Sequence, residues 1–437
     1  MTGKEHSLKR PIIEGEADMI VRKIKPEEFK RTEELFSIAF CFPYDNEKGP
    51  METYQDKKDN PEAREDVRIL DKYAAFEDDN KTMMSCFSAT RFPMNFNGNE
   101  VAMIGIGGVS TVPTYRRQGG IRGCFTKMLP EVYKEGAVFS YLYPFSTCFY
   151  NKFGYGLGIR GKVYELDLSR IPKYGTRGKS ILIEQENCQE KLEDIATVYE
   201  VWQRKYNGMI INGPLEYQFI SNANPFKKQE FVYLYYSVDG IPKGYISFHK
   251  EDSDGGRILA CTKIVFTDAE GLMGLLELTA SYAADYRSVR FTVPEDIEIE
   301  AVLKEFSFGA CKLNRSYMGM VRVINVEEAL RLSSYHGDGN IALQITDPYI
   351  EENTGVFQVI YQEGKAKEVS RVSETTTRKK ENTSVIAMQI DRFSEFIFQN
   401  RPASDFLYYG EQSLTEEEVR KLEQTFVRRT SFLMEYF

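Results

Sequence analysis

The hydrophobic and polar positions of this chain predict strands and helices in alternation. Residues 20–24 alternate as in a strand, and Pro26 then begins an amphipathic helix. Residues 83–112 contain two apolar runs on either side of an Asn-Gly-Asn sequence at 97–99, and this is the pattern of a β-hairpin. The first part of the chain is therefore expected to fold around a sheet.

A junction between a strand and a helix follows the hairpin. Six apolar residues beyond it have the spacing of one buried helix face, so the helix is predicted to begin just after Gly119 and Gly120. These residues are Ile121, Cys124, Phe125, Met128, Leu129 and Val132. Residues 137–145 then predict a buried strand, and residues 146–156 a short helix.

The pattern of strands leading into a helix occurs a second time. Residues 191–206 predict a helix, residues 230–268 a run of strands with Asp-Gly turns, and residues 269–286 another helix. Two stretches with the same order of elements indicate an internal duplication.

The last part of the chain is strand-rich and ends in a helix. We expect strands over 339–372, a strand followed by a helix over 384–400, and a final helix from Thr415, whose first turn is acidic. The polar stretch 373–384 is predicted to be a connector, and the highly charged stretch 54–70 a solvated helix or a lid.

The length of 437 residues suggests about three domains of ~150 residues each. We expect a polar N-terminal tail over residues 1–18 and domains over residues 19–162, 163–318 and 319–437. The mixture of strands and helices predicts a fold class that is α+β or mixed α/β.

Composition narrows the range of functions. The net charge of −9 argues against a nucleic-acid-binding protein and suits a cationic ligand. The seven cysteines are scattered and the three histidines lie far apart, which favours free thiols in a reducing compartment and makes a histidine-based metal site improbable. No apolar run approaches the ~20 residues of a membrane span, and the N-terminus lacks an apolar signal core. The expected location is the cytoplasm, with no membrane partner.

The junction before the predicted helix has the chemistry of an anion site. The first amide groups of a helix lack backbone partners and carry partial positive charge. Glycines there let the backbone approach a ligand, and Arg116, Arg117 and Arg122 add full charges. These features favour a phosphate or pyrophosphate. The alternative is a solvated surface turn with ordinary arginines.

The sequence VSTVPTYRRQGGIRG at 109–123, followed by FYNKFGYG at 149–156, resembles the two core motifs of the GNAT acetyltransferases. The wider chain resembles one branch of that family, the enhanced intracellular survival proteins. The segments IALQITD, VFQVIY and SVIAMQIDRFSEFIF resemble sterol carrier protein domains.

The resemblance implies two tandem GNAT-like domains, each a mixed central sheet flanked by helices, and a sterol-carrier-protein-like α+β domain that ends in the active site. The first domain is expected to be catalytic. The second is expected to be degenerate, because Asp268 and Glu270 stand where the first has arginines and would repel a pyrophosphate.

The resemblance also implies a site for acetyl-CoA as co-substrate, with no metal. The loop that holds its pyrophosphate in the family matches Arg116, Arg117, Gln118, Gly119, Gly120 and Ile121. Ile121 stands where the family has a small residue, which should reduce backbone approach at one phosphate. In the family the preceding strand splays from its neighbour, so the backbones of Val109 and Thr111 are expected to pair with the pantetheine arm; ordinary sheet pairing is the alternative.

Tyr150 matches the tyrosine that protonates the coenzyme A sulfur in the family. A phenol with a pKa of about 10 stays protonated at neutral pH and can act as that acid. An ordinary core position is the alternative, since the chain has 27 tyrosines; Tyr155 and Tyr143 are weaker candidates. An acyl-cysteine at Cys148 is disfavoured, because no histidine lies near it in sequence.

The chain ends in SFLMEYF, which is apolar for a terminus and suggests docking in a cavity. In the resembling proteins the terminal carboxylate enters the active site, so the carboxylate of Phe437 is expected to act as base or to hold the acceptor; a tail packed for stability alone is the alternative. Asp45, Glu47 and Glu435 are candidate carboxylates for binding the acceptor.

The resemblance implies an acceptor with several amines, such as an aminoglycoside, and a homo-oligomer, either trimer or hexamer. Two other functions stay open. In the first, the protein carries a lipid or other apolar molecule and has no catalytic activity. In the second, it acetylates protein lysines with the same catalytic residues.

Overall fold

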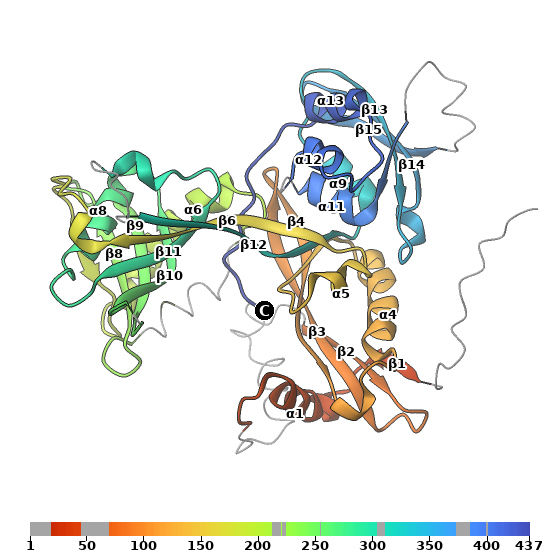
Figure 1. Cartoon of the computed structure of the whole chain (residues 1–437), viewed down its shortest axis with the longest axis horizontal. Helices are drawn as coiled ribbons and strands as arrows, with labels where there is room; N and C mark the ends of the chain where they lie inside the picture. Colours follow the sequence, from red (N-terminus) through yellow and green to blue (C-terminus); the bar gives the residue numbers. More distant parts are fainter. Residues whose placement is uncertain are drawn as a thin grey trace, which may run out of the picture.

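The computed structural model describes residues 19–44, 70–211, 220, 224–253, 255–303, 311–372, 385–398 and 401–437. It arranges them around one 12-stranded sheet and one 4-stranded sheet (Figure 1). The fold class is mixed α/β, as predicted. All but one residue of the charged stretch 54–70, and the connector 373–384, lie outside the described residues.

The large sheet is built from two halves with the same order of elements. The first half contains β1 (Ile20–Lys23), β2 (Leu70–Phe76), β3 (Met83–Phe96), β4 (Asn99–Thr111) and β5 (Ala137–Leu142). The second contains β7 (Lys179–Leu182), β8 (Glu230–Tyr236), β9 (Pro242–Glu251), β10 (Ile258–Phe266) and β11 (Ser288–Pro294). In each half the last two strands are parallel and a helix connects them. The predicted duplication is therefore present in the fold.

The two halves exchange their final strands at the centre of the sheet. β6 (Gly156–Asp167) follows the first half in sequence but pairs with β11, whereas β12 (Cys311–Val323) follows the second half and pairs with β5. β6 and β12 also pair with each other. The expected domain limits at 162 and 318 fall inside these two shared strands, and the division into domains stays a prediction.

Helices cover both faces of the first half. α1 (Phe29–Phe40) and α4 (Gly120–Lys134) lie on opposite faces, because successive side chains of a strand point in opposite directions. On β2, Tyr73 and Ala75 belong to the core beside α4, while Ala74 and Phe76 belong to the core beside α1. The short α5 (Thr147–Asn151) follows β5. The second half carries α6 (Cys188–Lys205) and α8 (Ala269–Ala280).

The third part of the molecule lies above the centre of the large sheet in Figure 1. Its four strands have the order β15 (Lys365–Val372), β14 (Gly355–Gln362), β13 (Gly339–Thr346) and β16 (Val385–Gln389). Its helices are α9 (Val326–Arg331), α11 (Ile390–Ile397), α12 (Ala403–Tyr408) and α13 (Glu416–Thr425). The sequence patterns did not reveal α12. The described residues also form five 3-10 helices: η1 (Pro26–Glu28), η2 (Pro113–Tyr115), η3 (Leu168–Arg170), η4 (Ile299–Val302) and η5 (Glu351–Asn353).

Local chemistry explains two of the predicted element boundaries. The hairpin turn needs two residues in the left-handed region, and Asn97 and Gly98 supply φ values of 52° and 85°. The turn is one residue shorter than expected, because Asn99 already pairs with Phe96. α13 begins after Thr415, whose hydroxyl accepts from the amide of Glu418 while the Glu418 carboxylate accepts from the Thr415 amide.

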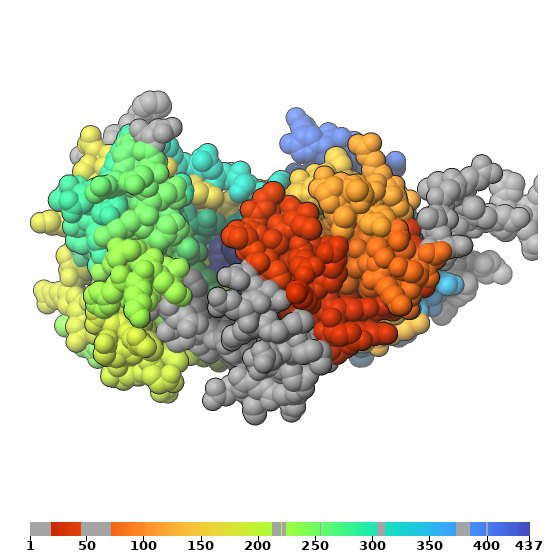
Figure 2. Space-filling model, turned by 90° about the horizontal axis from the view of Figure 1, so that it is seen from below, coloured from red at the N-terminus to blue at the C-terminus, as the bar shows by residue number. Residues whose placement is uncertain are grey.

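The segment after α13 returns from the third part to the middle of the molecule. Thr430 and Phe432 exchange backbone hydrogen bonds with Asn207 at 3.1 and 2.7 Å, and the ring of Phe432 packs on Trp202. Figure 2 shows dark blue atoms of this C-terminal segment at the bottom of a hollow between the two halves of the sheet. The tail thus touches the second half before it reaches the first.

All seven cysteines are free thiols. Among the described residues, no helix is long and apolar enough to cross a membrane. The same residues contain no group of three or more His, Cys, Asp or Glu side chains placed to hold a metal ion.

Candidate active site

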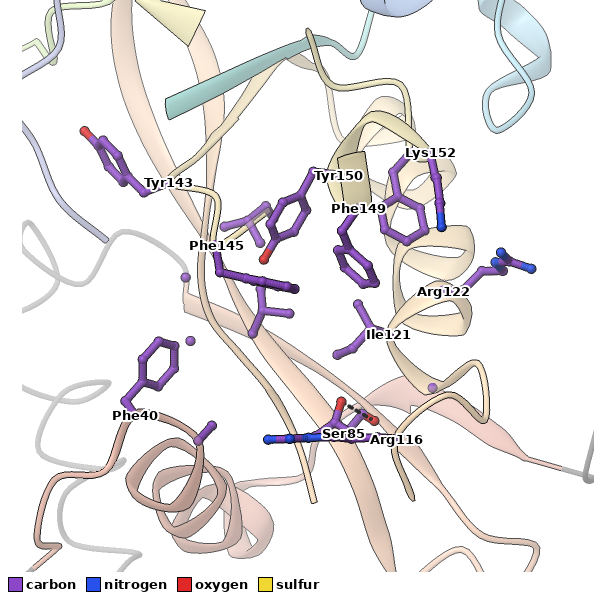
Figure 3. Close-up of a pocket in the computed structure, with 18 of the residues that line it drawn as sticks. Phe40, Ser85, Arg116, Ile121, Arg122, Tyr143, Phe145, Phe149, Tyr150 and Lys152 are labelled. Atoms are coloured by element: carbon purple, nitrogen blue, oxygen red, sulfur yellow. Dashed lines mark hydrogen bonds between the residues drawn. The ribbon is translucent and has the colours of Figure 1, made fainter. Parts of the chain in front are cut away.

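A cavity of about 860 Å³ lies between α1, β4, α4, α5 and the C-terminus (Figure 3). This volume is within the ~300–1,000 Å³ that is usual for small-molecule sites. Eleven of the residues singled out from the sequence line it: Val109, Thr111, Arg116, Arg117, Gly119, Gly120, Ile121, Arg122, Tyr143, Tyr150 and Phe437. The structure therefore brings together two motifs and a terminus that are far apart in the chain.

The cavity opens where β4 and β5 separate. Their parallel pairing ends at Ile106 and Leu142, although β4 continues to Thr111. β4 contains an extra residue at this point, since its register against β3 shifts between Cys86 and Ser88, and Gly108 there has a φ of 60°. The expected splay is thus present, and Val109 and Thr111 lie along it. Their pairing with a pantetheine arm stays a prediction.

The turn before α4 presents backbone amides to the cavity. Arg117 and Gly119 have φ values of 68° and 88°, so the chain turns through the left-handed region twice before the helix begins. The first bond of the helix runs from the amide of Gly123 to the carbonyl of Gly119 at 2.9 Å. The amides of residues 120–122 therefore have no acceptor within the helix. A helix start of this kind attracts anions.

Glycine at position 120 has a packing role beside the backbone approach that the sequence suggested. A Cβ at Gly120 would lie 2.5 Å from the hydroxyl oxygen of Ser85 on β3. The missing side chain lets α4 pack closely on the sheet at a point where both Gly120 and Ser85 line the cavity. Gly119, by contrast, is required for its positive φ.

Positively charged residues form part of the cavity lining. Arg116, Arg117, Arg122 and Lys152 line the cavity, and none of them forms an ion pair with a carboxylate among the described residues. No Asp or Glu side chain occurs among the described lining residues. This lining fits a polyphosphate, because it combines four cationic residues with a helix N-terminus.

Ile121 is buried at 8% exposure and belongs to the core between α4 and the sheet. It also lines the cavity, where Figure 3 shows it below Phe149. The expected effect of its size on a bound phosphate stays a prediction.

Tyr150 stands on α5 with its hydroxyl group pointing into the cavity beside Phe145 (Figure 3). The residue is only 2% exposed, and its ring makes edge contacts with Phe145, Phe149 and Phe125. Burial raises the pKa of the phenol, and neighbouring Tyr155 adds to the effect. Within the described residues the hydroxyl has no hydrogen-bond partner. The phenol therefore stays protonated and aims its proton at the space that a ligand would fill.

The two weaker tyrosine candidates have structural contacts. The hydroxyl of Tyr155 is buried and hydrogen-bonded to Ser140 at 2.7 Å. The hydroxyl of Tyr143 donates to the backbone carbonyl of Glu435 at 2.6 Å and so holds the C-terminal tail.

The C-terminal carboxyl group lies against β4. A Cβ at Gly107 would come within 2.4 Å of the carboxyl carbon of Phe437, and one at Gly105 within 2.7 Å of its ring. That ring also packs on Phe92 and Tyr143, with centroids 5.2 and 5.5 Å apart. Glycine at 105 and 107 therefore makes the seat that brings the terminal carboxylate into the cavity.

Two of the predicted binding residues that the structure describes do not line the cavity. Gln118 is exposed and donates to the carbonyl of Thr114 at 3.2 Å. Glu435 is buried at 6% exposure in the tail but is not part of the cavity wall. Asp45 and also Glu47 lie outside the described residues.

Sequence reasoning missed the aromatic rings at the mouth. Phe40, Phe145 and Tyr436 are 57%, 73% and 75% exposed and line the cavity. Tyr436 stacks on Tyr143 with centroids 4.7 Å apart. The signal was available in part, because Phe40 ends the predicted first helix and Tyr436 belongs to the apolar tail.

In the second half of the sheet, the start of α8 corresponds to the start of α4 but has different contacts. The carboxylate of Asp268 accepts from the amide of Gly271 at 3.0 Å and forms an ion pair with Lys243 at 2.6 Å. A side chain of the protein thus occupies the position that an anionic ligand would take. This arrangement supports the expectation that the second half binds no acetyl-CoA.

Comparison with known families agrees with this geometry. Residues 20–158 match the model of the acetyltransferase (GNAT) domain, and residues 326–434 match that of the sterol carrier protein domain. Residues 20–158 are a GNAT acetyltransferase domain. The GNAT domain makes the protein an acetyltransferase and implies the use of acetyl-CoA. It contains the loop before α4 together with β4 and α5.

Solved structures share the fold along nearly the whole chain. A probable N-acyltransferase from Enterococcus faecalis V583 is 20% identical with a TM-score of 0.78, and a GCN5-related N-acetyltransferase from Anabaena variabilis is 17% identical with the same TM-score. Eis1 from Mycobacterium abscessus is 15% identical with a TM-score of 0.73. Each comparison covers 96% of this chain and 100% of the other. No curated protein matches the sequence.

Proposed function

We propose that this protein moves the acetyl group of acetyl-CoA to a primary amine of a polycationic acceptor such as an aminoglycoside, by direct attack in a ternary complex. The observation that carries the proposal is one cavity lined by an arginine-bearing helix start, a buried phenol with a raised pKa and the chain-terminal residue. We further propose that it belongs with the enhanced intracellular survival proteins and acts in the cytoplasm, as a trimer or hexamer.

The cationic part of the cavity lining is assigned to acetyl-CoA, which brings an acetyl thioester to the centre as a substrate. Arg116, Arg117 and the amides of residues 120–122 would hold its pyrophosphate, and the backbones of Val109 and Thr111 its pantetheine arm. Gln118 belongs to this loop through its backbone, since its side chain bonds elsewhere.

Tyr150 is proposed as the general acid. Transfer of the acetyl group breaks the bond between carbon and sulfur, and the departing thiolate takes a proton most easily from a nearby neutral acid. The raised pKa of the buried phenol keeps that proton available at neutral pH.

The terminal carboxylate of Phe437 is proposed to hold the ammonium group of the acceptor and to take up a proton from it, directly or through water. A carboxylate is a weak base towards an ammonium, so holding the cation is its larger contribution. The exposed rings of Phe40, Phe145 and Tyr436 favour a cationic acceptor as well, because aromatic faces attract cations. Asp45 and Glu435 are proposed as further carboxylates that contact the acceptor, although Glu435 is not among the described residues that line the cavity.

The proposal is tested by release of coenzyme A thiol from acetyl-CoA in the presence of kanamycin, spermidine or a lysine peptide, with the enzyme tagged only at its N-terminus. Amine-dependent release with kanamycin or spermidine supports it. Release with the peptide alone would assign a protein lysine acceptor. Binding of a fluorescent fatty acid without any binding of coenzyme A would replace the enzyme with an apolar-ligand carrier.

A further inference from the structure

A buried ion pair joins the large sheet to the third part of the molecule directly behind α5. The guanidinium of Arg322, on β12, lies 2.7 Å from the carboxylate of Asp347, which follows β13, and both side chains have 0% exposure. Asp347 also accepts from the amides of Tyr349 and Ile350 and from the side chain of Asn353. The pair is therefore fixed from both sides.

The same guanidinium also donates a hydrogen bond to the segment that follows Tyr150. Arg322 donates from Nε to the carbonyl of Phe153 at 2.7 Å and from Nη1 to the carbonyl of Val323 at 2.8 Å. The amide of Phe153 in turn donates to the carbonyl of Tyr150 at 2.9 Å, which closes the end of α5. One chain of contacts thus runs from Asp347 through Arg322 to the backbone of Tyr150.

Helix α11 of the third part adds two contacts on either side of this loop. Asn151 donates to the carboxylate of Asp391 at 2.8 Å, and the amide of Leu157 donates to the buried carboxylate of Glu395 at 2.9 Å. Gly156 has no room for a side chain, because a Cβ there would lie 2.4 Å from the carbonyl of Asp391. The third part therefore holds residues 151–157 at three separate points.

We propose that Arg322, set by Asp347, is a positioning residue that fixes the hydroxyl of Tyr150 for proton transfer, and that the sterol-carrier-like part serves as its platform. The proposal rests on the role of Tyr150 under the proposed function. A buried ion pair contributes little net stability compared with apolar residues of the same size. The guanidinium of Arg322 donates both to a loop carbonyl and to a fixed carboxylate. Placement of that loop explains this arrangement better than a gain in stability does.

The substitution Arg322→Lys tests the proposal, because lysine keeps the charge beside Asp347 but loses the fork that reaches Phe153. We expect kcat for acetyl transfer from acetyl-CoA to kanamycin to fall about 10- to 100-fold, since small misplacements of catalytic groups have effects of that order. The KM for acetyl-CoA should stay within about 2-fold, as in a positioning defect. Lys162→Met is the matched control, because Lys162 is also fully buried and bound to a backbone carbonyl, that of Ile297, at 3.1 Å.

A double-mutant cycle separates positioning from general destabilisation. In a Tyr150→Phe background, Arg322→Lys should lower kcat by less than about 2-fold, because the group that it positions is gone. An equal loss in both backgrounds would overturn the proposal. If Tyr150→Phe alone leaves kcat unchanged, the acid assignment fails instead.

Hydrogen exchange gives a readout that does not depend on the acceptor. The amides of residues 147–157 should exchange at least several-fold faster in Arg322→Lys than in the wild type or in Lys162→Met. Unchanged exchange in a folded variant would overturn the proposal. If Arg322→Lys does not fold, Asp391→Ala takes its place, because it removes the contact with Asn151 and leaves no unpaired buried charge. The same faster exchange of residues 147–157 and the same loss of kcat are expected, and their absence would overturn the proposal.

Discussion

Tyr150 shows how the surroundings of one side chain fix its chemistry. A surface phenol would lose its proton at a pH of about 10. Burial among Phe125, Phe145 and Phe149 disfavours the phenolate and raises the pKa further. The hydroxyl nonetheless reaches the cavity, so it keeps a proton and a place to deliver it.

The raised pKa of Tyr150 makes a prediction about the pH dependence of kcat. Because the neutral phenol is the active form and the folded-state pKa lies above the ordinary value, activity should not fall between about pH 8 and pH 10 through loss of this proton. The measurement is kcat against pH at saturating acetyl-CoA. An alkaline limb below pH 9 that disappears in Tyr150→Phe would contradict the assignment.

Gly107 also carries a prediction, because its missing side chain is part of the seat for the terminal carboxylate. Gly107→Ala should push Phe437 out of place and lower kcat at least about 10-fold, in line with the cost of misplacing a reacting group. Gly98→Ala is not a fair control, since Gly98 needs its positive φ; Gly123→Ala, on α4, tests crowding away from the carboxylate. Equal activity of Gly107→Ala and wild type would show that the carboxylate is dispensable.

At the scale of elements, the two helix starts after β4 and β10 distinguish the halves of the sheet. α4 begins with bare amides flanked by arginines, whereas α8 begins with the Asp268 carboxylate already bound to its first turn. The start of α4 is therefore available to an anionic ligand, whereas the start of α8 is occupied by the carboxylate of Asp268.

This difference predicts one coenzyme A site per chain. Titration calorimetry should give a stoichiometry of one, and Arg117→Glu should abolish the binding because it reverses a charge at the helix start that lines the cavity. Lys243→Glu, in the second half, should leave the stoichiometry unchanged. Two sites per chain in the wild type would refute the assignment.

The elements themselves could be predicted from the sequence to a large extent, because their patterns are local. The hairpin, α4, α5, α6, α8 and α13 all appear where periodicity and turn residues placed them. The site could be predicted only where a motif is continuous, as at residues 116–121. The tight packing at Gly120, the off-cavity position of Glu435 and the seat at Gly107 depend on contacts between distant segments, which no local pattern contains.

At the scale of the molecule, the C-terminal tail connects all three parts. It leaves α13 in the third part, bonds to Asn207 beside the second half and ends on β4 of the first. Phe432 packs against Trp202, the only tryptophan of the chain, which is itself 2% exposed. The docking of the tail can therefore be followed through one fluorophore.

Phe432→Ala should loosen the tail and expose Trp202, so the fluorescence emission should shift to the red. The loss of a buried phenylalanine should also lower the free energy of unfolding by about 3–5 kcal/mol. Activity should fall with the shift, because the terminal carboxylate is carried by the same tail. Phe226→Ala, at a 72% exposed ring, is the control. An unchanged emission spectrum would mean that the tail does not pack on Trp202 in solution.

The most direct test of the account is kcat for acetyl transfer in Tyr150→Phe, measured as amine-dependent release of coenzyme A thiol by enzyme with a free C-terminus. Tyr133→Phe, on α4 and outside the cavity, is the matched control. The account predicts a loss of about 10²-fold or more in Tyr150→Phe, with coenzyme A binding retained and with Tyr133→Phe close to wild type. Wild-type turnover in Tyr150→Phe would contradict the claim that this buried phenol is the acid of the reaction.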